Sequence, residues 1–277
     1  MSQKHSTKMV PIPSDVIIPE RDLGKKPVLD IRNLGIDFGG LTAVDEFTLT
    51  IGKTEIAGLI GPNGAGKTTI FNLLTNVYQP TRGSILLQGI DTKGMTTAQV
   101  NKLGIARTFQ NIRLFRQMTV IDNVKAAFTK DIRYNLFDAS FRTKKYWDTE
   151  RQITEKAMEL LEICGLADKA NELASSLPYG RQRKLEIARA LATDMKLLLL
   201  DEPAAGMNPT ETAELLSCIN TIRERFGVAI LLIEHDMSLV MNICERIQVI
   251  DYGQTIASGL PEEIANNPKV IAAYLGE

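Results

Sequence analysis

Three short, uninterrupted apolar runs stand out in the hydrophobic pattern of this 277-residue chain. They fall within residues 55–64, 196–203 and 228–236, and each ends in glycine, acid or histidine. Strands that are buried on both faces of a parallel sheet have this pattern, because helices cover both sides of the sheet. The runs therefore predict three strands of a parallel sheet.

Helical patterns follow the first two runs and predict the α/β alternation that a parallel sheet requires. After the second run, Asn208 is expected to cap a helix, with Pro209 in its first turn and Glu211 at the capping-box position. After the first run, apolar residues recur at helical spacing and predict one buried face: Ile70, Phe71, Leu74 and Val77.

The regions before and between these runs have different patterns. Residues 28–58 are strand-like with glycine breaks, which predicts an antiparallel portion. Residues 95–190 are mainly helical and polar, and a predicted helix there stops at Gly165. Its apolar face consists of Ile153, Ala157, Leu160, Leu161 and Ile163. We therefore expect an α/β fold with a parallel sheet, an N-terminal antiparallel β portion and an inserted helical subdomain at roughly 111–195.

Composition adds limits on the class of protein. Residues 1–27 mix charge, proline and serine and are expected to form a flexible tail, followed by a single domain over 28–277. The formal net charge of -1 gives no global attraction to nucleic acid. The three separated cysteines predict reduced, buried thiols: Cys164, Cys218 and Cys244. No apolar run approaches the about 20 residues of a spanning helix, so any membrane role is expected to come through a partner.

The stretch "GPNGAGKTT" at 61–69 lies between the first predicted strand and its helix, and matches the P-loop pattern G-x-x-x-x-G-K-[ST]. Its glycines allow turns that point backbone amides at phosphate oxygens, beside a helix N-terminus. Lys67 is expected to bridge the outer phosphates, and the Thr68 hydroxyl to hold Mg²⁺. A chance glycine-rich turn is the alternative. The predicted ATP-binding residues here are Gly61, Asn63, Gly64, Ala65, Gly66, Lys67, Thr68 and Thr69.

Two carboxylates end the second apolar run. Asp201 at the strand end can hold Mg²⁺ through water, and Glu202 points elsewhere and can polarise an attacking water. The alternative for such a pair is a solvated acidic strand end.

Two further polar residues are candidates for the same chemistry. Gln110 follows the first predicted strand at a moderate interval and could reach the metal and the water, although a loop glutamine is commonly just solvated. His235 ends the third run, at the sheet edge where ligands bind in such folds. A lone histidine is more often structural, and the only other one is His5 in the tail.

A Leu-x-x-Gly-x-Gln-Arg turn, "LPYGRQR" at 177–183, precedes the second run by about 20 residues. Together with the P-loop, Gln110, "LLLLDEP", "AGMNP" and His235, it resembles the ATP-binding subunit of an ABC transporter, over essentially the whole chain from residue 28. The resemblance implies a P-loop ATPase core, with ATP and Mg²⁺ as ligands.

The resemblance also implies roles for single residues. Phe38 would be the aromatic platform that stacks on adenine, although a Phe in a strand is usually a core residue, and Val44 would be a further ATP-binding residue. Glu202 would be the general base and His235 the γ-phosphate sensor. Mg²⁺ would be held by Thr68, Gln110 and Asp201. The residues that close over ATP held by an opposite subunit would be Pro178, Tyr179, Gly180 and Arg181.

Longer stretches are similar to one branch of the family, the LivG-type subunits of branched-chain amino-acid importers. They are "FGGLTAVD", "RTFQNIRLFRQMTVIDNV", "DEPAAGMNP", "LLIEHDMSLVM", "VIAAYLGE" and the insert at roughly 129–150. Importers for urea or amides and the lipopolysaccharide-export ATPase share much of this pattern. From other classes, a soluble ABC ATPase and a P-loop kinase without a membrane partner stay as alternatives.

The branch resemblance implies the assembly as well. Expected partners are transmembrane permease subunits, docked beside Leu114, Phe115 and Met118, and a second, related ATP-binding subunit in a head-to-tail dimer. A solute-binding protein would act indirectly, and no nucleic acid is expected. The place of action would be the cytoplasmic face of the inner membrane, as a peripheral subunit.

The turn at 177–183 departs from the usual Leu-Ser-Gly-Gly-Gln of the family. Pro178 replaces the serine and has neither a hydroxyl nor a backbone N–H. We therefore expect closure over the partner's ATP through the Gly180 amide and Arg181, and weaker than through a serine.

Overall fold

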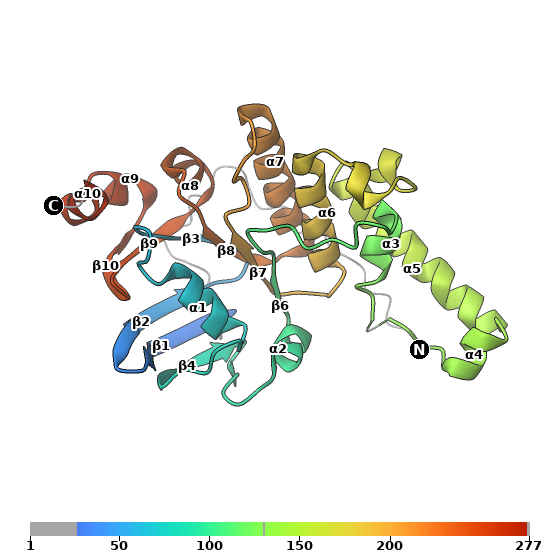
Figure 1. Ribbon diagram of the computed structural model, residues 1–277, viewed down its shortest axis with the longest axis horizontal. Coiled ribbons are helices and arrows are strands. Elements are labelled where there is room, and N and C mark those ends of the chain that lie inside the picture. Colours follow the sequence, from blue (N-terminus) through green and yellow to red (C-terminus); the bar gives the residue numbers. More distant parts are fainter. Residues whose placement is uncertain (1–26, 130, 276–277) are drawn as a thin grey trace. The chain divides into compact units, whose positions relative to one another are not determined.

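A computed structural model describes residues 27–129 and 131–275 (Figure 1). The predicted tail at 1–27 therefore lies, except for Pro27, outside the described residues. Contacts divide the chain into two compact units. Unit 1 holds residues up to Arg107, Lys196–Pro203 and Ile222 onwards, and unit 2 holds Thr108–Met195 and Ala204–Thr221. The predicted helical subdomain at 111–195 falls in unit 2, which also takes the segment after Pro203.

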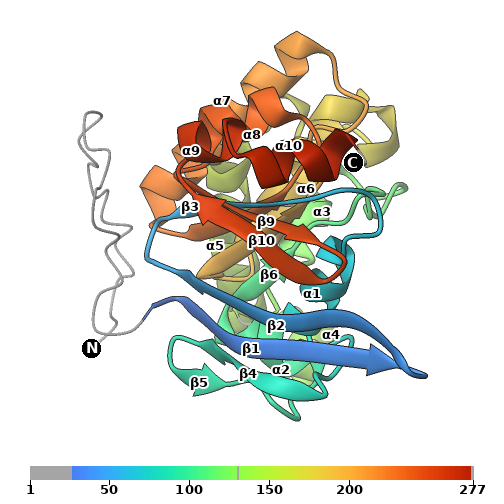
Figure 2. The same ribbon diagram turned by 90° about the vertical axis from the view of Figure 1, so that its left-hand side faces the viewer.

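Unit 1 begins with an antiparallel sheet in the order β2-β1-β4-β5 (Figure 2). Its strands are β1 (Leu29–Phe38), β2 (Leu41–Ile51), β4 (Arg82–Leu87) and β5 (Ile90–Asp91). Along β2, Phe47, Leu49 and Ile51 alternate with more exposed residues, as a half-buried strand requires. The predicted antiparallel portion is confirmed.

The second sheet of unit 1 has the order β10-β9-β3-β8-β7-β6, and only β10 runs antiparallel to its neighbour. Its strands are β3 (Ile56–Ile60), β6 (Ile105–Arg107), β7 (Leu197–Asp201), β8 (Ala229–Ile233), β9 (Arg246–Asp251) and β10 (Gln254–Gly259). Every residue of β3, β7 and β8 is buried, as their apolar runs predict. Because these three strands are parallel, their carboxyl ends meet at one edge, where residues 61, 202 and 234 follow.

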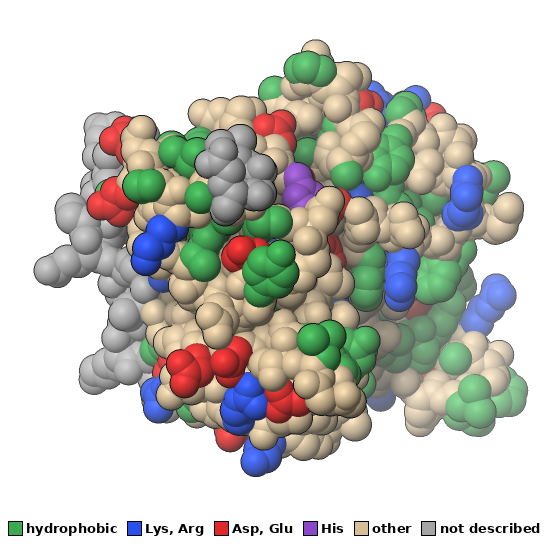
Figure 3. Space-filling model, turned by 60° about the vertical axis from the view of Figure 1, so that its left-hand side comes forward, with side chains coloured by type: hydrophobic (Ala, Val, Ile, Leu, Met, Phe, Trp, Pro, Cys, Tyr) green, Lys and Arg blue, Asp and Glu red, His purple; other side chains and the backbone are tan. Residues whose placement is uncertain are grey.

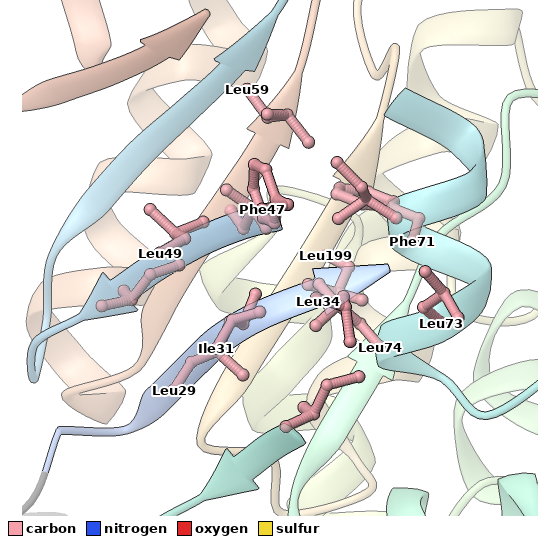
Figure 4. Close-up of a cluster of buried hydrophobic side chains, with 14 of the residues drawn as sticks. Leu29, Ile31, Leu34, Phe47, Leu49, Leu59, Phe71, Leu73, Leu74 and Leu199 are labelled. Carbon is pink, nitrogen blue, oxygen red and sulfur yellow. The ribbon is translucent and has the colours of Figure 1, made fainter. Parts of the chain in front are cut away.

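The main hydrophobic cluster of unit 1 joins the two sheets through α1 (Lys67–Leu74). Figure 4 shows Leu34 of β1, Phe47 of β2, Phe71 of α1 and Leu199 of β7 converging on it. Three of the four residues predicted on the buried face of this helix are buried, but Val77 is 56% exposed. The prediction for Val77 is wrong because α1 ends earlier.

The end of α1 explains that difference. The Thr75 hydroxyl donates to the Phe71 carbonyl at 2.8 Å, and Asn76 takes a left-handed backbone with φ 53°. The chain therefore turns away from the helical path before Val77.

The remaining helices of unit 1 are short: α2 (Thr97–Leu103), α8 (Met237–Ile243), α9 (Pro261–Ala265) and α10 (Pro268–Leu275). The α8 helix begins at Asp236, whose carboxylate accepts hydrogen bonds from the amides of Ser238 and Leu239. Such a cap satisfies amides that have no partner within the first helical turn.

Unit 2 is helical, as the sequence predicts. It contains α3 (Val120–Lys125), α4 (Leu136–Ser140), α5 (Lys144–Ile163), α6 (Tyr179–Leu191), most of α7 (Pro209–Phe226) and two short 3₁₀ turns, Ala167–Lys169 and Ala174–Ser176. The helix before Gly165 buries its predicted apolar face except Ile163, which is only half-buried. Gly165 has φ 67°, as a helix C-terminus favours.

The start of α7 confirms the predicted capping box. The Asn208 side chain accepts from the Glu211 amide at 3.0 Å, and the Glu211 carboxylate accepts from the Asn208 amide at 3.1 Å. All three cysteines are buried free thiols. Across residues 27–129 and 131–275, no helix combines the length and the apolar character needed to cross a membrane.

Candidate nucleotide-binding site

The P-loop connects β3 to α1 in unit 1, as its position in the sequence predicts. A Cβ on Gly61 would lie 2.0 Å from the Ile250 carbonyl oxygen, and Gly66 caps α1 with φ 102°. Any other residue at either position would displace the loop. Asn63, Gly64 and Thr68 are exposed, so this part of the loop faces solvent. The other predicted residues of the loop, Ala65 and Thr69, are buried and half-buried.

Lys67 is buried at the foot of the loop. Its Nζ donates to the carbonyl oxygens of Gly61 at 2.6 Å and Pro62 at 2.8 Å. Burial lowers the pKa of Lys67, and the charges of Glu202 and Asp201 oppose that shift. The Lys67 ammonium group is thus held by two carbonyl oxygens of the loop. Phosphate oxygens of a bound nucleotide would compete with these carbonyls for its hydrogen bonds.

Asp201, at the end of β7, forms a buried ion pair that the sequence did not reveal. Its Oδ2 accepts from the Arg107 guanidinium at 2.6 Å, and the same guanidinium donates to Asn72 Oδ1 at 2.7 Å. Arg107 ends the neighbouring strand β6, which runs parallel to β7. The pair therefore links Asp201 to the helix that follows the P-loop.

Glu202 and His235 meet at the same sheet edge. His235 Nε2 lies 2.7 Å from Glu202 Oε1, and the Glu202 amide donates to the Ile233 carbonyl at 2.9 Å. Glu202 has φ 45°, a left-handed backbone that is strained for a residue with a Cβ. The two adjacent carboxylates thus have different partners, Arg107 for Asp201 and His235 for Glu202.

His235 is open to solvent. Its side chain is 41% exposed, and it is the purple group in Figure 3, since His5 lies outside the described residues. Its amide donates to the buried carboxylate of Glu234 at 3.1 Å. The Glu202 carboxylate and the His235 imidazole therefore form a pair in which one group can orient the other.

Phe38 ends β1 with its ring 42% exposed, so it is not a core residue. It packs edge-on against Tyr78 with ring centroids 5.2 Å apart. The structure therefore leaves the Phe38 ring available for stacking, and Tyr78 is a neighbour that the sequence did not reveal. Val44 differs, because its side chain is fully buried and lies 3.6 Å from where a Cβ of Gly66 would be. In this structure Val44 supports the P-loop from behind.

Gln110 and the turn at 178–181 lie in unit 2 and are described within it. Gln110 has an exposed side chain, and its carbonyl accepts from Arg183 at 2.8 Å. Arg183 is fully buried on α6, and it also donates to the Phe109 carbonyl at 2.6 Å and pairs with Glu186 at 2.8 Å. A single side chain thus fixes the backbone of Gln110 to the helix that starts at the turn.

The turn itself caps α6. Pro178 occupies the N-cap position without a side-chain hydrogen bond, and the Tyr179 hydroxyl accepts from Arg183 at 3.3 Å. Gly180 is buried, and a Cβ there would lie 3.1 Å from a carboxylate oxygen of Glu211. Arg181 is half-buried, 3.8 Å from Asp168. Of the two groups expected to contact the partner's ATP, Arg181 is the more accessible within this unit.

The residues of unit 1 fit a magnesium nucleotide. The loop amides and Lys67 suit phosphate oxygens, and Thr68 is an exposed hydroxyl residue in the first turn of α1. In the described part of the chain, no cluster of three or more His, Cys, Asp or Glu residues could hold a metal by itself. Mg²⁺ in nucleotide sites is held by few protein ligands together with phosphates and water.

Comparison with known proteins places this geometry among transport ATPases. The ABC transporter family matches residues 44–205, and the family described as branched-chain amino acid ATP-binding cassette transporter matches residues 254–277. The high-affinity branched-chain amino acid transport ATP-binding protein LivG of Escherichia coli strain K12 is 48% identical, over 91% of this chain and 99% of its own. Its counterpart BraF of Pseudomonas aeruginosa is 46% identical over the same shares.

Solved structures have the same fold. An ATP-binding cassette of an ABC transporter in its ADP conformation has a TM-score of 0.79 and 29% identity, over 91% of this chain and 99% of that one. A nucleotide-free cassette has a TM-score of 0.77 and 30% identity, over 91% and 100% of the two chains. The predicted α/β fold with a P-loop ATPase core is confirmed.

Proposed function

The chain belongs to the ABC transporter family of ATP-binding subunits, and on this premise we propose that it hydrolyses ATP to drive import of branched-chain amino acids through separate membrane subunits. The observation that carries the proposal is the 48% identity to LivG over nearly the whole of both chains. The match of residues 254–277 to the branched-chain amino acid family supports the same substrate class.

The chemistry proposed for unit 1 is phosphoryl transfer to water. The loop amides and Lys67 hold the phosphates, while Thr68 and Asp201 would hold Mg²⁺. When bound, Mg²⁺ neutralises charge that develops on the phosphate oxygens. Glu202 accepts a proton from the attacking water, and the His235 imidazole, 2.7 Å away, orients that carboxylate and contacts the γ-phosphate.

Nucleotide selection is assigned to Phe38. Its half-exposed ring at the end of β1 stacks on adenine, and Tyr78 supports the ring from the side. Val44 acts through the loop that it packs against.

The roles of unit 2 rest on family membership. Gln110 would be a further contact for Mg²⁺ and the water, and Pro178, Tyr179, Gly180 and Arg181 would close over ATP that is held by a second ATP-binding subunit. That subunit is a related but different chain in a head-to-tail dimer. Because Gly180 packs under Glu211, Arg181 carries the larger part of this contact.

The membrane partners are permease subunits whose cytoplasmic helices dock beside Leu114, Phe115 and Met118. Of these, Phe115 is exposed, and its amide and carbonyl are both bonded to the Asn123 side chain. These two hydrogen bonds fix the Phe115 backbone while its side chain remains exposed for docking. The protein acts as a peripheral subunit at the cytoplasmic face of the inner membrane, with a solute-binding protein acting through the permeases.

Reconstitution tests the proposal. The chain, a second ATP-binding subunit and two permease subunits are assembled in vesicles, and ATP hydrolysis is measured with a solute-binding protein and leucine, urea or no solute. Leucine should stimulate hydrolysis and accumulate in the vesicles. Stimulation by urea alone would assign the chain to an amide importer. Hydrolysis that no permease or solute changes would instead indicate an ATPase without a membrane partner.

A further inference from the structure

A group of exposed apolar side chains belongs to residues 132–147 of unit 2. Its members come from α4 and the segments on either side of it, and α4 lies beside the N-terminal end of α5 (Figure 1). Leu136 is 84% exposed and Phe141 is 69% exposed, which is far from the behaviour of core residues. We define the insert surface as Ile132, Leu136, Phe137, Phe141 and Trp147. None of these side chains serves the site described above.

The insert surface is built on an ordered scaffold. Asn135 caps α4 by a capping box with Asp138, and the rings of Phe137 and Phe141 lie 4.6 Å apart. Behind them, Tyr134 donates its hydroxyl to Glu150 of α5 at 2.9 Å. The aromatic rings are therefore held outward by local hydrogen bonds and packing.

Exposed basic residues stand among these apolar residues along the chain: Arg133, Arg142, Lys144 and Lys145. The two acids of the same stretch are engaged within the unit. Asp131 pairs with Lys156 at 2.8 Å, and Asp138 accepts from Thr143 at 2.9 Å, which lowers the pKa of Asp138. Lys145 is 3.8 Å from Asp138 but remains 58% exposed. The outward charge of the stretch is therefore positive.

We propose that the insert surface docks on the headgroup region of an anionic phospholipid bilayer. Aromatic and leucine side chains beside lysine and arginine are the combination that partitions into the interface of acidic membranes, where the cations meet lipid phosphates. Charge complementarity selects this occupant, since residues 131–147 carry four exposed cations, both of their acids are engaged within the unit, and Asp148 beyond them is half-buried. Because α4 has only five residues, the insertion is shallow and supplements an attachment made elsewhere.

Vesicle flotation of the full chain tests the proposal. The chain is mixed with vesicles of phosphatidylcholine alone or of phosphatidylcholine with phosphatidylglycerol, and the bound fraction is measured at low and high salt. Binding should require phosphatidylglycerol and should weaken with salt. Arg142→Ala and Lys144→Ala should each weaken it about fivefold, as expected for one cation near an anionic surface. Phe137→Ala with Phe141→Ala should reduce binding further.

Matched controls come from unit 1. Ile90→Ala and Lys93→Ala remove an exposed apolar and an exposed basic side chain outside the insert surface, and they should leave vesicle binding unchanged. ATP hydrolysis by each variant reports whether it is folded. Equal binding to neutral and anionic vesicles, or equal loss in control and insert variants, overturns the proposal. The proposal is also overturned if the unchanged chain does not bind vesicles while the insert variants lose co-purification with the permease. That result would identify a permease as the occupant.

Discussion

His235 Nε2 and Glu202 Oε1 lie 2.7 Å apart at the carboxyl edge of the parallel sheet, although 33 positions separate them in the chain. Parallel pairing brings them together, because β7 and β8 are adjacent and in register from Leu197 opposite Ala229 to Asp201 opposite Ile233. The left-handed backbone of Glu202 then directs its carboxylate to the imidazole.

Glu202→Gln should lower steady-state ATP hydrolysis by about 10²- to 10⁴-fold, the range for loss of a general base, without weakening nucleotide binding. The amide keeps the shape of the side chain but cannot accept the proton of water. Hydrolysis and titrated nucleotide affinity are measured side by side. Glu46→Gln is the control, since Glu46 is also exposed and has φ 49°. Normal hydrolysis by the Glu202→Gln variant would show that another group is the base.

His235→Ala should reduce hydrolysis by about 10- to 100-fold, because hydrogen bonds to charged groups contribute roughly 1.5–3 kcal/mol. If the imidazole acts through the Glu202 carboxylate, the double variant with Glu202→Gln should be little worse than Glu202→Gln alone. Fully additive losses would mean that His235 and Glu202 act independently.

Phe38→Ala should weaken ATP binding by about 1–3 kcal/mol, the scale of base–aromatic stacking. Phe38→Tyr keeps the ring and is the matched control, with affinity near that of the unchanged chain. Fluorescence titration with ATP and with inorganic triphosphate separates adenine contacts from phosphate contacts. Equal effects of Phe38→Ala on both ligands would contradict a stacking role.

Asp236→Ala should lower the free energy of unfolding by about 1 kcal/mol at neutral pH, through loss of the α8 cap. Hydrogen bonds from Ser238 and from the Leu239 amide lower the pKa of Asp236. The Asp236 carboxylate therefore contributes its full stabilisation above a pH of about 3.9, the ordinary pKa of Asp. This stabilisation is lost as the pH falls through the lower pKa that Asp236 has in the folded chain. Urea unfolding should thus show a difference that shrinks in acid. Asp236→Asn, which can still cap, should lose less at neutral pH.

Pro178→Ser should raise ATP hydrolysis by the assembled complex by about 10- to 100-fold, because the new hydroxyl can donate to the partner's γ-phosphate at a gain of about 1.5–3 kcal/mol. Pro178→Ala restores the backbone N–H without the hydroxyl and separates the two effects. An unchanged rate with serine would indicate that this turn does not limit the cycle.

Local patterns predicted the elements that depend on neighbouring residues. The P-loop between strand and helix, the capping box of Asn208 with Glu211 and the stop at Gly165 each involve residues only a few positions apart. The buried strands β3, β7 and β8 were equally evident, since a short unbroken apolar run is typical of a strand that is buried on both faces of a sheet.

Contacts between distant segments were not predictable in this way. Arg107 and Asp201 meet because β6 pairs with β7, and no pattern in a single sequence gives that strand order. The contact between Phe38 and Tyr78 also joins segments that are distant in the sequence. Tyr78 follows the exposed Val77, beyond the end of α1. The left-handed backbone of Glu202 is accompanied by a hydrogen bond from its amide to Ile233, which belongs to another strand.

The buried Arg183 has a mechanical consequence. It holds two successive carbonyls, those of Phe109 and Gln110, while Glu186 neutralises its charge within the same interior. Pulling the backbone of Gln110 away from α6 would leave Arg183 paired with Glu186 but would break its hydrogen bonds to both carbonyls, at a cost of roughly 1–3 kcal/mol for each buried group left without a partner. The Gln110 backbone and the first turns of α6 are therefore one rigid piece, so any force on that segment is passed directly to residues 178–181.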